Sequence, residues 1–277
     1  MARSKAFTLV ELLVVIAIIA LLMSILMPAL NRVRKQAKSV ACKVTLHQWS
    51  LLWGLYCEDN DNNFCYAGNR WRRGQWIVAL RPQWETRSDL LRCPMAVKIP
   101  PWRESGDNWG GPYHTYIMGT TGGTTLREEC SFGANCWIYD AQPGEDYIQN
   151  RPTTWNWKTP DVSGGNNIPV FADTMWRGGG PFTGGKVLPD DLPDRGSPPV
   201  YDGEWSGASS EMKHFCIDRH NERINMLFMD WSSRDVGLKE LWTLKWHRFF
   251  STSGHWTMAG GVLPRDWPAW MRNFKDY

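Results

Sequence analysis

An apolar run near the N-terminus constrains this chain more than any other feature. Between Leu12 and Met27 the only polar residue is Ser24. With its apolar flanks, the run reaches the roughly 17–25 residues that a helix needs to cross a bilayer. No small-x-small cleavage site follows it, because the triplet Met27-Pro28-Ala29 begins with Met. The sequence therefore favours a retained membrane-spanning helix over a secretory signal peptide that is removed.

The helical pattern continues beyond the apolar run. Apolar residues recur at steps of three and four, with basic residues between them. This pattern predicts one helix from Phe7 to about Cys57, roughly 75 Å long at 1.5 Å per residue. Pro28 lies inside it, removes one backbone hydrogen bond and is expected to kink it. The stripe expected to pack against a sheet consists of Val40, Val44, Leu51 and Leu55.

Glu11 is out of place in this apolar segment. A carboxylate at mid-bilayer depth costs about 2.5–3.5 kcal/mol on insertion scales, and a buried charge needs a partner. If the chain is cut between Ala6 and Phe7, the new amine of Phe7 lies four residues before Glu11. The amine of one subunit can equally pair with Glu11 of a neighbouring subunit.

The string Ala6-Phe7-Thr8-Leu9-Val10-Glu11-Leu12 resembles the cleavage and methylation site of type IV prepilins and type II secretion pseudopilins. The resemblance implies that a prepilin peptidase removes the leader and methylates Phe7. It implies that Glu11 then pairs with a neighbouring amine and sets the axial register. Ala6 stands where this family usually has Gly, and similar pilins also carry a Pro at the position of Pro28.

The same resemblance implies a function and a location. The subunit would be held in the bacterial inner membrane, with the leader in the cytoplasm and the head in the periplasm, and would then enter a filament or reach the cell surface. Its partners would be prepilin peptidase, copies of itself, other pilins or pseudopilins, and the inner-membrane assembly platform. The expected function is a structural subunit of a type IV pilus-like or type II secretion filament.

Charge and motifs exclude other classes of protein. The formal net charge is only +3, and residues 1–57 carry seven basic residues against one acidic residue. The body of the chain is therefore nearly neutral, a charge that argues neither for nor against nucleic acid. We expect no nucleic-acid partner. The sequence contains no nucleophile elbow, no phosphate-binding glycine loop and no His-Glu-x-x-His motif. We expect that the protein is not an enzyme.

The expected organisation is α+β. It comprises a leader (1–6), a transmembrane or filament-core helix (7–30), an amphipathic continuation (31–57) and one globular head (58–277). In the head, the long helix should pack on a small antiparallel sheet with large loops, and a helical stretch is expected near Lys239–His247. The predicted strands are Tyr113–Met118, Ser131–Tyr139, Ile168–Asp173 and Ile224–Trp231, the last followed by a turn at Ser232-Ser233 and the segment Arg234–Gly237.

Head segments resemble a narrower pseudopilin-like subgroup that carries a C-terminal signature of His, nine residues, Asp and Gly. Here His220 and Asp230 have this spacing, but Trp231 replaces the Gly. The two residues could form an acid–base or metal pair. Alternatively, His220 orients a hairpin and Asp230 occupies its turn, and we favour this second interpretation.

Residues 58–63 weakly resemble a calcium loop, with Asp59 and Asp61 as candidate ligands. The run lacks the Gly and the distal Glu of an EF-hand. A solvated loop at the end of the helix is the favoured interpretation, so no cofactor is expected, with calcium as the weaker alternative.

The seven cysteines suit an exported protein, because an oxidising compartment closes thiol pairs. The leading predicted disulfide joins Cys42 to Cys93 and would tie the helix to the head. Two short-range pairs are also plausible, and they would leave Cys216 over. These pairs are Cys57–Cys65 and Cys130–Cys136.

The chain contains 18 tryptophans, several of them in loop-like sequence. A glycan- or cargo-binding surface is one interpretation, since aromatic faces supply much contact area. It corresponds to an alternative function: a membrane-tethered or filament-tip binding protein. The other interpretation, which we favour, is that tryptophans pack long loops onto a small sheet. The loop tryptophans are Trp102, Trp109, Trp155, Trp157, Trp176 and Trp205.

Overall fold

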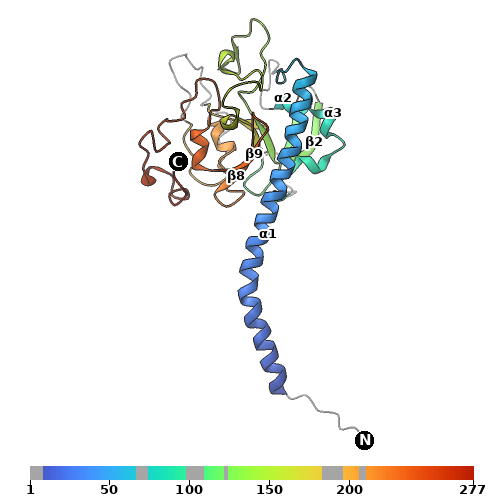
Figure 1. Ribbon diagram of the computed structural model, residues 1–277, viewed down its shortest axis with the longest axis vertical. Helices are drawn as coiled ribbons and strands as arrows, with labels where there is room; N and C mark the ends of the chain where they lie inside the picture. Colours follow the sequence, from blue (N-terminus) through green and yellow to red (C-terminus); the bar gives the residue numbers. More distant parts are fainter. Residues whose placement is uncertain (1–8, 67–73, 98–108, 122–123, 183–195, 206–209) are drawn as a thin grey trace.

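A single helix carries the head at one of its ends. The computed structural model describes residues 9–66, 74–97, 109–121, 124–182, 196–205 and 210–277. Helix α1 spans Leu9–Asp59, and its N-terminal part extends alone from the head (Figure 1). The helix continues through Pro28. The long N-terminal helix and the α+β class are thus confirmed.

The centre of the head is a five-stranded sheet of order β7-β3-β6-β8-β9. Neighbouring strands are antiparallel except for β3 and β7, which are parallel. The sheet is therefore mixed rather than purely antiparallel as expected, because the short parallel strand β7 was not among the predicted strands. Its strands are β3 (Phe132–Asn135), β6 (Pro169–Asp173), β7 (Gly178–Gly179), β8 (Arg223–Phe228) and β9 (Ser233–Gly237).

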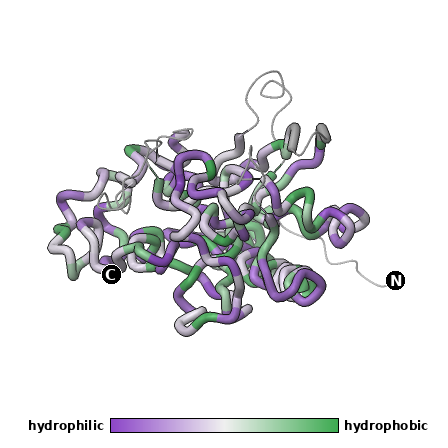
Figure 2. Tube along the Cα trace, turned by 90° about the horizontal axis from the view of Figure 1, so that it is seen from above, coloured by the Kyte–Doolittle hydropathy of each residue, from purple (hydrophilic) through white to green (hydrophobic). Residues whose placement is uncertain are grey.

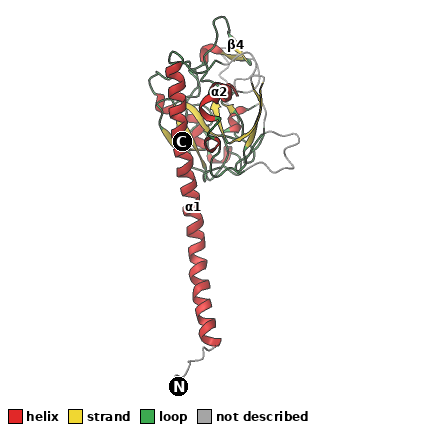
Figure 3. Cartoon of the chain, turned by 90° about the vertical axis from the view of Figure 1, so that its right-hand side faces the viewer, coloured by secondary structure: helices red, strands yellow, loops and turns green. Residues whose placement is uncertain are grey.

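Smaller elements surround this sheet, joined by the large loops visible in Figure 3. Two further hairpins are β1 (Tyr116–Thr121) with β2 (Thr124–Cys130), and β4 (Tyr147–Ile148) with β5 (Arg151–Pro152). Short helices are α2 (Gln75–Ala79) and α3 (Arg81–Trp84). The helical stretch expected near Lys239–His247 is a single 3₁₀ segment, Lys239–Thr243. The remaining 3₁₀ segments are Ser88–Leu91, Thr153–Trp155, Gly165–Asn167, Glu211–His214 and Pro264–Asp266.

The predicted packing face of α1 was wrong. The four aliphatic residues of the expected stripe are all more than half exposed: Val40 56%, Val44 54%, Leu51 59% and Leu55 53%. The buried face consists instead of Cys42, Leu46, Trp49, Trp53 and Cys57. Both sets follow helical spacing, so the period alone could not choose between them. The two tryptophans decide it, since each carries more apolar surface than a Val or Leu.

An aromatic cluster joins α1 to the sheet. The ring of Phe171 on β6 lies 4.8 Å from Trp49, 4.8 Å from Trp76 and 6.2 Å from Trp53. The indole N–H of Trp49 donates to the Leu90 carbonyl at 2.7 Å, so its polar atom is satisfied in the core. This cluster fixes α1 against one layer of the head.

A second core lies against the other side chains of the sheet. Ile224, Met226 and Phe228 of β8 belong to it, whereas Leu227 belongs to the core on the α1 side. The C-terminal segment covers this second core with Trp267 and Met271, both buried. Figures 1 and 2 place the C-terminal segment on the side of the head away from α1.

The loop tryptophans pack the head. Trp155 and Trp176 are buried, and Trp109 stacks on Trp205 with ring centroids 4.8 Å apart. Trp109, Trp157 and Trp205 are half-buried. Trp102 lies outside the described residues. The described members of this set therefore contribute mainly to the cores.

Candidate functional site

A buried cluster forms where α1 meets the head. Cys42 belongs to α1, Cys93 follows the Ser88–Leu91 turn, Asp173 ends β6 and His220 precedes β8. One donor atom from each of the four side chains lies within 4.8 Å of the other three. Cys42, Cys93 and Asp173 are fully buried, and His220 is 9% exposed.

Specific contacts hold the cluster together. Cys42 Sγ lies 3.6 and 3.5 Å from the two carboxylate oxygens of Asp173. His220 Nε2 lies 3.3 Å from Cys93 Sγ and 3.0 Å from Asp173 Oδ2. Both contacts of His220 thus use the same ring nitrogen, so the donor atoms converge on one region.

Arg219 and the backbone orient the Asp173 carboxylate. Arg219 Nη1 donates to Asp173 Oδ1 at 3.1 Å and to the Ser131 carbonyl at 2.7 Å. The Asn225 backbone N–H donates to Asp173 Oδ2 at 2.9 Å. Arg219 is fully buried and also reaches the carbonyls of Gly111, Pro112 and Thr174. A buried carboxylate with these partners keeps its charge.

The proton affinities of the cluster reflect these contacts. Burial opposes charge on Asp173, but His220 and Arg219 hold its carboxyl pKa well below the usual range. Burial also opposes charge on His220, yet Asp173 raises its pKa to about 9. Burial tends to raise the thiol pKa of Cys93, but hydrogen bonds with Cys42 and His220 outweigh this effect and lower the pKa to about 7. Burial raises the pKa of Cys42 well above that of an ordinary thiol.

This arrangement differs from a nucleophilic triad. In a Cys-His-Asp relay the base uses one ring nitrogen for the nucleophile and the other for the carboxylate. Here Nε2 serves both Cys93 and Asp173, and His220 Nδ1 has no hydrogen-bond partner among the described residues. The cluster therefore lacks the geometry of a proton relay.

The other end of α1 has a different character. α1 is the one helix among the described residues that is long and apolar enough to cross a membrane, and its most apolar stretch has no residue buried in the head. Glu11 lies in its first turn and is exposed. The predicted processing residues Ala6 and Phe7 lie outside the described residues.

Residues 1–27 match the family model described as the prokaryotic N-terminal methylation motif. This N-terminal motif marks type IV pilin-like proteins and pseudopilins. No curated protein and no solved structure matches it. The motif implies processing of this chain by prepilin peptidase, and with the apolar helix it indicates a membrane-anchored protein. Pilin-like proteins are typically structural rather than enzymatic.

The head separates the two residues of the His-x9-Asp signature. His220 precedes β8 and contacts Cys93 and Asp173, whereas Asp230 follows β8. Asp230 accepts hydrogen bonds from the Ser232 N–H at 3.0 Å and hydroxyl at 2.6 Å. Trp231 has a φ of 64°, so the turn adopts the left-handed conformation although Trp replaces Gly.

The weak calcium candidates lie far along α1 from the buried cluster. Asp59 is the last residue of α1, and Asp61 follows in the turn with a φ of 53°. The group of close metal-binding side chains found in the described part of the chain includes neither.

All seven cysteines of the chain are buried free thiols in this structure. The predicted partners Cys42 and Cys93 do lie together, in the buried cluster. Cys216 lies 3.9 Å from the sulfur of Met271 in the second core.

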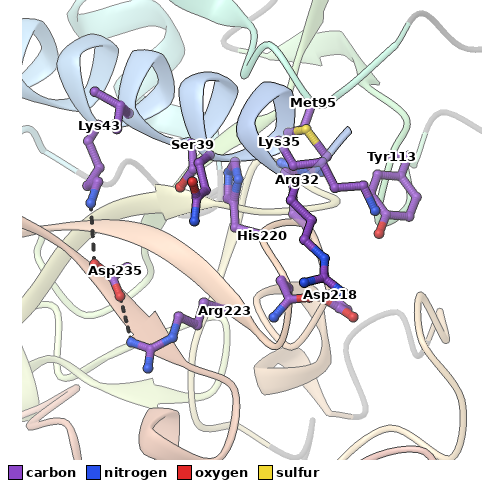
Figure 4. A pocket seen from close by; sticks show the side chains of 14 residues that line it. Arg32, Lys35, Ser39, Lys43, Met95, Tyr113, Asp218, His220, Arg223 and Asp235 are labelled. Atoms are coloured by element: carbon purple, nitrogen blue, oxygen red, sulfur yellow. Dashed lines mark hydrogen bonds and ion pairs between the residues drawn. The ribbon is translucent and has the colours of Figure 1, made fainter. Parts of the chain in front are cut away.

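A cavity of about 900 Å³ opens beside the cluster, between α1 and the β8–β9 hairpin (Figure 4). Arg32 and Lys35 of α1 line it with Arg223, and His220 forms part of its wall. Lys43 of α1 and Arg223 of β8 both bind Asp235 of β9, the former at 3.3 Å. The Lys43–Asp235 pair adds a second attachment of α1 to the sheet.

Sequence reasoning missed Asp173 and Arg219 as members of this site. Asp173 was named only as the end of a predicted strand, and Arg219 was not singled out. An aspartate at the end of the apolar strand Val170-Phe171-Ala172-Asp173 was the available signal, because a carboxylate there needs a buried cation.

Proposed function

We propose that this protein is a structural subunit of a type IV pilus-like or type II secretion filament. In this proposal, prepilin peptidase cuts between Ala6 and Phe7, and the mature subunit assembles through α1. The observation that carries the proposal is the exposed apolar stripe on α1.

The stripe continues the membrane segment along one side of the helix. At 100° per residue its members fall within an arc of about 80°. The residues buried in the head lie on the opposite side of α1. The members of the stripe, all at least 48% exposed, are Leu30, Val33, Val40, Val44, Leu51 and Leu55.

A second copy of α1 is the partner that fits this surface. An extended apolar patch outside the bilayer is unfavourable in water and marks an interaction surface. The partner must cover both the membrane segment and its continuation, so it must itself be a long apolar helix. Packing of α1 helices in a filament core meets both requirements.

The proposal also assigns the topology and the remaining partners. The leader would lie in the cytoplasm, α1 in the bacterial inner membrane and the head in the periplasm before assembly. Glu11 would pair with the methylated amine of Phe7, on its own chain or on a neighbour. Other pilins or pseudopilins and an inner-membrane assembly platform would complete the machine.

The test changes the exposed stripe without changing the buried face. The double substitution Val44→Lys and Leu51→Lys should abolish filaments, because it places two cations in an apolar helix interface. The matched control is Asn31→Lys, which adds a cation to the exposed opposite side of α1. Electron microscopy would count filaments, and tryptophan fluorescence would verify that each head is folded.

Two further measurements bear on the same proposal. Intact-mass analysis of the mature protein should find a chain that begins at methylated Phe7. Glu11→Ala should abolish assembly while the head stays folded. Normal filaments from both the stripe variant and Glu11→Ala would contradict the proposal and favour a tethered binding protein. Among the described tryptophans, no exposed cluster favours that alternative.

A further inference from the structure

The buried cluster brings together four metal-binding side chains from segments far apart in the sequence. We propose that Cys42, Cys93, Asp173 and His220 bind one Zn²⁺ ion, which fastens α1 to the sheet of the head. This metal centre is independent of filament assembly. It gives the contact between α1 and the head a metal-binding role.

The distances between the donor atoms fit a tetrahedral site. With Zn–S near 2.3 Å and Zn–N or Zn–O near 2.0 Å, neighbouring ligands in a tetrahedron lie about 3.3–3.8 Å apart. Three of the six separations are 3.5 Å from Cys42 Sγ to Asp173, 3.3 Å from Cys93 Sγ to His220 and 3.0 Å from His220 to Asp173, and all six lie within 4.8 Å. Small side-chain rotations would therefore complete the site.

The ligand types select zinc among divalent ions. Calcium and magnesium take oxygen ligands, whereas two thiolates with an imidazole suit zinc. Binding releases the two thiol protons and the His220 ring proton to solvent, so the ligands carry a charge of about −3. The ion reduces this to about −1, and the buried Arg219 guanidinium at 3.1 Å from Asp173 balances the remainder.

The surroundings of the cluster resemble those of a supported metal site. Ligating carboxylates are usually held by further hydrogen bonds, and Asp173 has them from Arg219 and the Asn225 N–H. His220 lines the cavity between α1 and the hairpin, which gives an ion a path to the site from solvent. The side-chain amide of Asn225 also donates to the Ser39 carbonyl of α1 at 3.2 Å, so the residues that surround the site bind α1 as well.

A disulfide between Cys42 and Cys93 is the competing fate of the two thiols. It would account for two of the four side chains and leave the convergence of Asp173 and His220 without a role. The metal centre accounts for all four, so it is the inference we adopt.

The first experiment uses the full chain, extracted in detergent from bacterial membranes without chelators. Elemental analysis should find about one zinc per chain. X-ray absorption at the zinc edge should show a first shell of two sulfur and two nitrogen or oxygen atoms, with Zn–S near 2.3 Å. Exchange with Co²⁺ should give a thiolate-to-cobalt charge-transfer band. These readouts need no variant.

Variants then assign the ligands. Cys93→Ser and His220→Gln should each weaken zinc binding by about 100-fold or more, given that loss of a supporting residue alone costs 10–100-fold. The matched control is Cys216→Ser, a buried cysteine in the second core, which should keep zinc at one per chain. A chelator should lower the Tm of the wild type and of Cys216→Ser.

Three results would overturn the inference. One is a wild-type chain that holds no zinc and gives no cobalt–thiolate band. Another is a zinc shell without sulfur. The last is peptide mapping under non-reducing conditions that finds Cys42 and Cys93 joined in a disulfide. None of these results would affect the filament proposal, which depends on the opposite face of α1.

Discussion

At the scale of single residues, the head depends on polar groups buried among aromatic rings. His247 is fully buried, and its ring lies 4.7 Å from Trp137 and 4.8 Å from Trp155. The Phe249 N–H donates to His247 Nδ1 at 3.2 Å, which requires that nitrogen to be unprotonated. Burial, helped by the charge of Lys245, lowers the His247 pKa from 6.5 to about 3.

This burial predicts a loss of stability in acid. The neutral ring stabilises the fold fully above pH about 6.5, and the contribution falls as pH drops toward 3, at about 1.4 kcal/mol per pH unit for one proton. His247→Asn keeps an acceptor for the Phe249 N–H but cannot take up a proton. Urea unfolding between pH 7 and pH 4 should therefore show a shallower decline for the variant. Equal declines would contradict the prediction, whatever the difference in absolute stability.

The buried polar residues of the head show which contacts could be predicted from the sequence and which could not. The pairing of Cys42 with Cys93 as neighbours could be predicted, because a helix cysteine and a head cysteine suggested a link. Asp173 and Arg219 could not be assigned as partners, since 46 positions separate them and only the fold brings them to 3.1 Å. The turn at Trp231 shows the reverse case, because it has a left-handed φ of 64° although the residue is not Gly.

At the scale of elements, α1 presents two apolar faces with different partners. Trp53 is fully buried against Phe171 and Phe64, whereas Leu51 is 59% exposed on the opposite face. The sequence predicted only the aliphatic face and expected it to pack against the head, whereas that face is exposed and the buried face was not predicted. The prediction chose the face that carries Val and Leu side chains. The face that is buried against the head is instead the one that carries the larger indole rings.

The two faces should respond differently to truncation. Trp53→Ala should destabilise the head by about 3–5 kcal/mol, because it opens a cavity in the core. Leu51→Ala should change unfolding by no more than about 0.5 kcal/mol, since it removes a side chain that the head does not contact. Denaturant unfolding of the detergent-solubilised chain would measure both. Similar losses for the two variants would mean that the assignment of faces is incorrect.

At the scale of the whole molecule, the sheet is enclosed by α1 on one side and by the C-terminal segment on the other. The sequence after residue 247 carries no predicted element and resembles no familiar pattern. Its tryptophans nevertheless close the second core, as Trp242 and Trp256 both contact Trp267, at 5.3 and 5.2 Å. Irregular backbone with large side chains can thus complete a layer that neither helix nor strand patterns reveal.

The C-terminal layer should therefore matter for the stability of the entire head. Trp267→Ala should lower the free energy of unfolding by about 3–5 kcal/mol, in the range for a buried Trp. Leu263→Ala, four residues earlier and 44% exposed, should have little effect. Limited proteolysis and urea unfolding would compare the two. A stable, protease-resistant Trp267→Ala head would show that the segment is dispensable.

The continuity of α1 has a mechanical consequence. The helix beyond residue 30 is about 44 Å long at 1.5 Å per residue, and its last turns are embedded in the head. Tension applied to the head thus reaches the bilayer through a single stiff rod, with no intervening linker. Within the described helix, the backbone hydrogen-bond ladder lacks an N–H donor only at Pro28, just before this rod begins. Under load, α1 should yield first at Pro28, at the membrane edge, while the head moves as a rigid body.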